Sequence, residues 1–170
     1  MNEEQLNAAA IEISRPTEED LKAVFGFWRA QHQLHYELDP AYYKPNFPEL
    51  DYLAREYFEK LIKTDSPHIL VARLPGRIVG FITFDEKKPG SGIETFASNL
   101  ADHVEIIDLF IDENLRGKKV GTQLMTEVQK HCQKVGMLNM KVEVATSNTD
   151  ALAFYKKLGF VPRQTEMFKT

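Results

Sequence analysis

One strand-turn-helix pattern, residues 104–136, restricts the fold more than any other part of the sequence. It starts with "VEIIDLFID", an apolar run of strand length with several β-branched side chains. A short turn follows, and then a segment whose apolar residues recur every four positions, as on a helix with one buried face: Val120, Leu124, Val128 and Cys132. Gly136 is the type of residue that ends a helix. A strand that runs through a tight turn into a helix indicates helices layered on a sheet.

The flanking patterns predict the remaining elements. Before this stretch we expect a strand at 11–14, a helix at about 18–33 after a Thr17–Asp20 capping box, a helix at about 50–63, and a hairpin of residues 68–74 and 78–84. After it we expect a strand at 138–145, a helix between Asn148 and Gly159, and a last strand at 161–170 that closes the sheet. The expected order is β-α-α-β-β-β-α-β-α-β, a mixed α/β (α+β) fold.

Composition indicates one soluble domain, residues 11–170, after a loose tail of residues 1–10. The chain has 170 residues, 43% apolar and 27% charged, which is ordinary for a single domain. No apolar run approaches the roughly 20 residues of a membrane span, and the acidic start lacks the pattern of a signal peptide. The lone Cys132 excludes an intrachain disulfide and favours the reducing cytoplasm, and a net charge of −4 argues against a nucleic-acid partner.

The turn "NLRGKKVGTQL" has the features of an anion site. The first N–H groups of a helix have no partner within it and carry the positive end of the helix dipole. Gly117 and Gly121 would let the backbone approach a phosphate or diphosphate, and Arg116, Lys118 and Lys119 add positive charge. Neither common nucleotide-binding glycine pattern is present. The alternative is a solvated basic turn in which Gly121 serves close packing between helices.

Two motifs in order resemble the GNAT-type N-acetyltransferase superfamily: "IIDLFIDENLRGKKVGTQLM", and later "VATSNTDALAFYKKLGF". In that superfamily a [QR]-x-x-G-x-[GA] turn binds the diphosphate of acetyl-coenzyme A, and the pattern falls here on residues 116–121. The resemblance is close from about His68 to Phe160 and implies a mostly antiparallel N-terminal half and a splayed central strand pair. Lys119 stands in place of the first motif glycine, and we expect its N–H to reach a phosphate from helical backbone angles.

The resemblance also implies where the cofactor lies. The pantetheine arm would pair along the strand at Leu109, Phe110 and Ile111, with Leu109 nearest the reacting carbonyl. The remaining cofactor-binding residues implied are Arg116, Gly117, Lys118, Lys119, Val120, Gly121, Thr122, Asn148 and Tyr155. Asn148 has a second interpretation as a plain helix cap.

Tyr155 and Glu105 are the catalytic candidates. Tyr155 matches the position of a general acid in many relatives, and a phenol of ordinary pKa near 10 can protonate a departing thiolate. Glu105 lies eleven residues before Arg116, where several relatives keep a glutamate that removes the amine proton. By strict alternation Glu105 shares a strand face with Leu109, and Asp108 points to the opposite face. The alternatives are a core tyrosine and a solvated glutamate at a strand end.

The acceptor site is expected in the first two helices, their connecting loop and "KKPGSGIETF". Carboxylates and aromatic rings gather in that loop and would suit a cationic amine. Tyr36, Glu37 and Asp108 are the candidate substrate contacts. His32 and His35 lie one helical turn apart, but such pairs are usually surface residues, so no metal is expected.

These observations predict an acetyl-coenzyme A-dependent N-acetyltransferase that acts on a primary amine of a small molecule or peptide, by direct attack in a ternary complex. Two alternatives remain: an acyltransferase for a longer donor, and a coenzyme A sensor without turnover, which would need neither Tyr155 nor Glu105. No membrane partner is expected, and a homodimer stays open.

Overall fold

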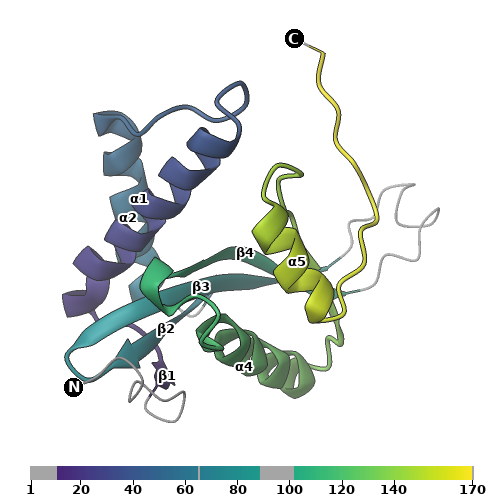
Figure 1. Ribbon diagram of the computed structural model, residues 1–170. Helices are drawn as coiled ribbons and strands as arrows, with labels where there is room; N and C mark the ends of the chain where they lie inside the picture. The colour runs from purple at the N-terminus through teal and green to yellow at the C-terminus, as the bar shows by residue number, and fades with distance from the viewer. Residues whose placement is uncertain (1–10, 65, 89–101, 170) are drawn as a thin grey trace.

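The computed structural model of the chain describes residues 11–64, 66–88 and 102–169 (Figure 1). The predicted tail 1–10 lies outside these residues. The strands are β1 (Glu12–Ser14), β2 (His68–Leu74), β3 (Arg77–Lys87), β4 (His103–Ile111) and β5 (Asn139–Val142). The helices are α1 (Leu21–Leu38), α2 (Pro48–Lys63), α4 (Val120–Val135) and α5 (Thr149–Lys157). Short 3₁₀ turns precede α1 and α4, at Glu18–Asp20 and Glu113–Leu115.

The five strands form one mixed sheet in the order β1-β2-β3-β4-β5. Every neighbouring pair from β1 to β4 is antiparallel, and β5 joins β4 in parallel. The antiparallel N-terminal half and the predicted element order are therefore confirmed as far as α5.

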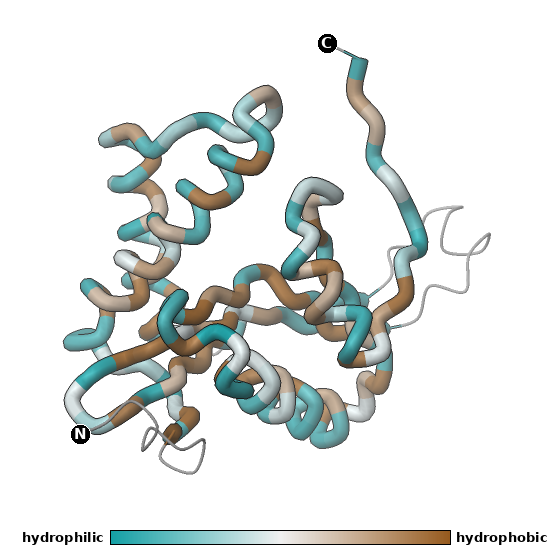
Figure 2. Tube along the Cα trace, viewed as in Figure 1, coloured by the Kyte–Doolittle hydropathy of each residue, from teal (hydrophilic) through white to brown (hydrophobic). Residues whose placement is uncertain are grey.

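Helices cover both faces of the sheet (Figure 1). On one face α1 and α2 enclose a cluster centred on Phe58 and Phe81, and on the other α4 and α5 enclose a larger cluster with Leu124, Val128 and Tyr155. Figure 2 shows brown, apolar residues along β3 and β4 and alternating brown and teal residues around the helices. This pattern is that of a central sheet buried between amphipathic helices.

The ends of the first helix differ from the prediction. The Thr17–Asp20 capping box is present, but it opens a 3₁₀ turn, and α1 extends from Leu21 to Leu38, five residues past the predicted end. The helix ends only at Asp39, whose N–H still bonds to the carbonyl oxygen of His35 and which precedes Pro40, a residue that disfavours helical angles in its neighbour.

The predicted last strand at 161–170 is wrong for the residues that the structure describes. Residues 161–169 have no strand conformation and are exposed. Pro162 removes a ladder donor, and the polar run after it offers no apolar face to the sheet. The segment leads away from the sheet (Figure 1), and the Phe168 ring lies 5.3 Å from that of Tyr42 in the α1–α2 loop.

None of the helices in the described part of the chain has the length and apolar character needed to cross a bilayer.

Candidate active site

β4 and β5 pair over only four residues and then separate. Their ladder ends at Ile106 and Val142, whereas β4 continues to Ile111. Alternate N–H and C=O groups of residues 107–111 point away from β3, toward the side that β5 has left. The splayed strand pair implied by the resemblance is therefore confirmed, and it contains the residues expected to hold the pantetheine arm: Leu109, Phe110 and Ile111.

A β-bulge in β4 changes which side chains share a face. Thr83 pairs with Asp108 and Phe84 pairs with Ile106, so Ile107 is an extra residue without a cross-strand partner. After the bulge Leu109 packs in the α4 cluster together with Ile106. Asp108 is consequently on the α1 side, the same face as Glu105. The prediction that Asp108 and Glu105 point to opposite faces is wrong, because strict alternation takes no account of an inserted residue.

Asp108 is the central ionisable group of this region. Its carboxylate accepts hydrogen bonds from Thr83 Oγ1 at 2.6 Å and from Gln31 Nε2 at 3.1 Å. Burial raises the pKa of Asp108 above its ordinary value, against the lowering effect of these two donors. The buried Oε1 of Gln31 has no hydrogen-bond partner among the described residues. The site thus presents an ionisable oxygen and an unsatisfied acceptor side by side.

Tyr155 on α5 is buried and lies close enough to Asp108 for the two groups to interact electrostatically. Its ring contacts those of Phe154 and Phe160 edge to face. Burial, and then the negative charge of Asp108, raises the pKa of the Tyr155 hydroxyl. The phenol therefore keeps its proton throughout the neutral range. Tyr155 is thus a core ring whose protonated hydroxyl lies within range of a carboxylate charge, which is compatible with both interpretations of this residue.

Glu105 has a different environment. Lys141 on β5 donates a hydrogen bond to its carboxylate at 2.9 Å and also binds Glu143 at 2.8 Å. The charge that raises the pKa of Tyr155 is therefore that of Asp108 rather than that of Glu105. The sequence did contain a signal for Asp108: it is the only charged residue in the apolar run "IIDLFI".

The turn before α4 is exposed and contains two left-handed residues. Gly117 has φ +77°, and Lys119 has φ +65° and ψ 7°. The expected helical angles for Lys119 are therefore wrong, and a residue with a Cβ occupies a conformation that favours glycine. Val120, Gly121 and Thr122 follow in the first turn of α4, where N–H groups have no intrahelical acceptor.

Gly121 serves packing between helices. A Cβ built there would lie 3.2 Å from Phe154 Cζ and 3.8 Å from Ile111 Cγ1. The missing side chain thus makes room for Phe154 on α5, as the alternative interpretation of this glycine proposed. Its N–H still belongs to the first turn of α4, so the two interpretations are compatible.

The other cofactor candidates lie around the same turn. The guanidinium of Arg116 lies over the Phe110 ring, 5.2 Å from its centroid. Asn148 caps α5, its Oδ1 accepting from Ala151 N at 3.1 Å. Lys118 is exposed.

The candidate acceptor residues are only partly brought together. Asp108 meets α1 through Gln31, but exposed Glu37 binds Gln33 on its own helix, at 2.9 Å, and Tyr36 is half-buried. His32 Nε2 lies 2.8 Å from the carbonyl oxygen of Lys44. Most of the predicted "KKPGSGIETF" region, residues 89–96, lies outside the described residues.

The chain belongs to the acetyltransferase (GNAT) family, whose pattern it matches over residues 31–160. It is 31% identical, over 113 residues, to an uncharacterized N-acetyltransferase of Methanocaldococcus jannaschii. That alignment covers 65% of this chain and 46% of the relative, so the chain spans about half the length of this curated protein.

Solved structures share the fold. A mutant of the BH1408 protein from Bacillus halodurans superposes with a TM-score of 0.81 at 18% identity, covering 94% of this chain and 98% of that chain. The aminoglycoside N-acetyltransferase AAC(6')-Iy, solved with a bisubstrate analogue containing coenzyme A, has a TM-score of 0.64 at 18% identity, covering 94% and 97%.

Proposed function

We propose that this protein is an N-acetyltransferase that transfers an acetyl group from acetyl-coenzyme A to a primary amine, by direct attack in a ternary complex. The observation that carries the proposal is the Asp108 carboxylate, held by Thr83 and Gln31 on the stretch of β4 that β5 has left, with the buried Tyr155 hydroxyl within range of its charge. It combines a proton acceptor, a proton donor and unpaired strand backbone, which are three requirements of acyl transfer to an amine.

The backbone is the proposed binding surface for acetyl-coenzyme A. The outward N–H and C=O groups of residues 107–111 would pair with the pantetheine amides, and an N–H at Leu109 would stabilise the oxyanion. The diphosphate would lie on the first turn of α4, against the N–H groups of Val120, Gly121 and Thr122, with Arg116, Lys118 and Lys119 adding charge. Asn148 remains a further candidate contact. Membership of the GNAT family and the coenzyme A analogue in AAC(6')-Iy support this arrangement.

Asp108 is the proposed proton acceptor. An amine arrives as an ammonium ion, which needs acceptors and must lose a proton before it attacks. The Asp108 carboxylate and the unsatisfied Gln31 Oε1 offer two acceptors at one place, and the raised pKa of Asp108 makes it a stronger base than an exposed aspartate. Glu105 stays a second candidate, which would act only after release from Lys141.

Tyr155 is the proposed proton donor to the departing thiolate. Its raised pKa keeps the hydroxyl protonated at neutral pH, so the group is available to donate a hydrogen bond, and then its proton, to the sulfur as the C–S bond breaks. The acceptor amine would enter between the α1–α2 loop and β4, the side from which Gln31 reaches Asp108. Tyr36 and Glu37 are the proposed outer contacts for such a substrate.

A thiol-release assay tests the proposal. The enzyme would be supplied with acetyl-coenzyme A and separate polyamines, amino acids, aminoglycosides and peptides, and Asp108→Asn would be assayed beside it. We expect turnover with at least one amine and its near loss in the variant. Cofactor binding in calorimetry without turnover on any amine would favour the sensor, and turnover only with longer acyl donors would favour the other alternative.

A further inference from the structure

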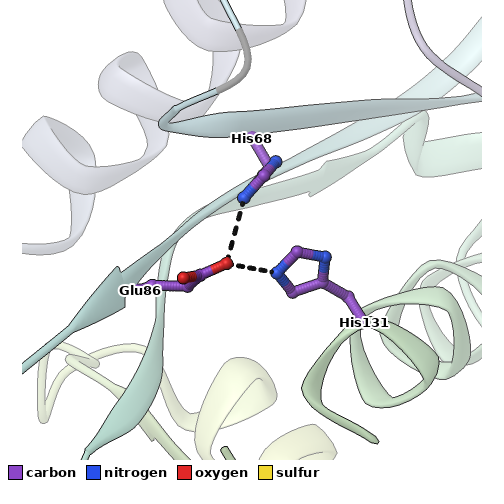
Figure 3. Close-up of side chains that lie close together, drawn as sticks. All are labelled: His68, Glu86 and His131. Atoms are coloured by element: carbon purple, nitrogen blue, oxygen red, sulfur yellow. Dashed lines mark hydrogen bonds and ion pairs between the residues drawn. The ribbon is translucent and has the colours of Figure 1, made fainter. Parts of the chain in front are cut away.

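His68, Glu86 and His131 form a compact cluster outside the proposed active site (Figure 3). One potential ligand atom from each residue lies within 4.8 Å of the others. The Glu86 Oε1 atom is 2.9 Å from His131 Nε2 and 3.6 Å from His68 Nε2. Figure 3 shows both imidazole rings directed at this one carboxylate oxygen.

The fold brings these three residues together from distant positions. His68 begins β2 and pairs with Phe84 of β3, so Glu86, two residues further, lies diagonally across the hairpin on the same face. His131 reaches this face from α4. The Phe84 ring stacks on His68 at 5.0 Å and meets His131 edge to face at 5.2 Å, which gives the cluster an apolar floor.

The cluster is remote from the acetyl-transfer site. It lies on the α4 face of the sheet, whereas Asp108 faces α1. His131 is also eleven residues along α4 from Val120, a distance of about 16 Å along the helix axis. Nothing in the proposed transfer reaction uses these side chains.

We propose that His68, Glu86 and His131 bind one divalent transition-metal ion, with Zn²⁺ as the best match. Two imidazoles and one carboxylate are a donor set that zinc accepts, with metal–ligand distances of about 2.0–2.2 Å. Ligand atoms of a tetrahedral ion at that distance lie about 3.4 Å apart. The present separations of 2.9 and 3.6 Å bracket this value, so small side-chain movements complete the site.

Space beside the cluster leaves room for a fourth ligand. A pocket of about 280 Å³ adjoins the two histidines. Its lining includes Arg15 and Lys134, and also Lys130 and Glu127, which form an ion pair at 2.7 Å, so a water molecule or a small anion has polar partners there as the fourth ligand. The bound ion would connect α4 to the β2–β3 hairpin.

Metal titration of the full chain, without an affinity tag and after treatment with a chelator, tests the proposal. Co²⁺ serves as the spectroscopic probe and Zn²⁺ as the competitor. We expect one Co²⁺ per chain, a visible absorption spectrum of low-coordinate cobalt, displacement by one equivalent of Zn²⁺, and a higher melting temperature with Zn²⁺.

Variants assign the ligands. His68→Ala and His131→Ala should each weaken Zn²⁺ binding at least about tenfold, and Glu86→Gln should do so while preserving side-chain shape. His35→Ala is the matched control, because His35 belongs to the other close histidine pair on α1, and it should leave affinity within about twofold. Circular dichroism verifies that each variant is folded. If a histidine variant unfolds, the Zn²⁺ affinity of Glu86→Gln tests the proposal in its place.

The proposal is overturned by the absence of Co²⁺ and Zn²⁺ binding, by unchanged affinity in Glu86→Gln, or by loss of the site in His35→Ala. Acetyl transfer is not part of the readout, so the result does not depend on the proposed function.

Discussion

Thr83 Oγ1 donates a hydrogen bond of 2.6 Å to Asp108 Oδ2 across the β3–β4 ladder, at the register position next to the bulge. Thr83 is fully buried, so water does not compete for its hydroxyl. The bond fixes one oxygen of the carboxylate and leaves the other for Gln31 and, in the proposed mechanism, for the substrate ammonium. A bulged strand thus holds the proposed base as a buried carboxylate fixed by a neighbouring strand.

Asp108→Asn should lower activity and raise stability. Burial raises the pKa of Asp108 in the folded state, so the ionised carboxylate at pH 7 destabilises the fold relative to the unfolded chain. The amide avoids this cost, and a rotated Gln31 can offer Oε1 to the new NH₂ group. We expect a higher melting temperature at pH 7, an advantage that shrinks as pH falls through the raised pKa, and a loss in kcat/KM of about 10²-fold or more.

Asp85→Asn is the control for this prediction. Burial alone would raise the pKa of Asp85, but hydrogen bonds from Lys87 and Ser66 together outweigh it and lower the pKa, so the same substitution should reduce stability there. Activity should stay within about threefold. Wild-type activity in Asp108→Asn would eliminate this residue as the base and return attention to Glu105.

Tyr155→Phe should reduce kcat by about 10²- to 10⁴-fold and keep cofactor affinity, because only the proton donor is lost. Burial raises the pKa of Tyr155, so its deprotonation should produce no decline of kcat below about pH 10 in the wild type. Steady-state kinetics measures kcat and calorimetry measures the affinity for acetyl-coenzyme A, both on one preparation. Tyr57→Phe is the comparison, since burial and Asp108 also raise the pKa of Tyr57, to about 12. If Tyr57→Phe were the more damaging change, Tyr57 would be the acid.

Lys119→Gly should stabilise the protein. The left-handed backbone at Lys119 costs a residue with a Cβ about 1 kcal/mol, a cost that glycine escapes. For a chain of this size the melting temperature should rise by about 2–4 °C. Gly117→Ala should lower the melting temperature, because φ at this residue is +77°. An added Cβ would contact no other atom, so the change would report the backbone strain alone. A neutral or destabilising Lys119→Gly would show that its side chain, rather than its backbone, determines stability here.

Asp20→Asn should weaken the fold at neutral pH and have little effect near pH 2. Arg73 donates to Asp20 Oδ1 at 2.9 Å, and this bond is the main reason why the pKa of Asp20 is lowered from 3.8 to about 2. The interaction with Arg73 contributes about 2 kcal/mol to the free energy of unfolding. This contribution is fully present above pH 3.8 and is lost as pH falls toward 2. Denaturant unfolding at several pH values measures it. Glu18→Gln, which removes an exposed ion pair with Lys63, should change stability by less than about 0.5 kcal/mol.

Periodicity predicted the elements that bury an apolar face. Apolar residues repeat at the spacing of a strand in the hairpin and in the strand at 103–111. They repeat at the spacing of a helix in the segment that ends before Gly136. The last strand was wrong because "VPRQTEMFKT" has a terminal position and some apolar residues but no partner in the described structure. Pairing between distant segments is a tertiary property that one segment's composition does not encode.

The site was predicted less completely, and the bulge is the reason. The motif indicated the turn, Tyr155 and the strand backbone, but one extra residue at Ile107 reverses the face of every residue after it. No local feature of "EIIDLF" announces an insertion. The histidine cluster was missed for a related reason, since His68, Glu86 and His131 are 18 and 45 residues apart and meet only through hairpin register and helix packing.

The contact between Gly121 and Phe154 has a consequence for the sequence of events in the reaction. Phe154 precedes Tyr155 on α5, so the first turn of α4 and the proposed acid are one side chain apart. If the diphosphate binds on that turn, its arrival also constrains the position of the phenol. The donor would then prepare the catalyst for the acceptor, and the kinetics should show compulsory order, with acetyl-coenzyme A binding before the amine.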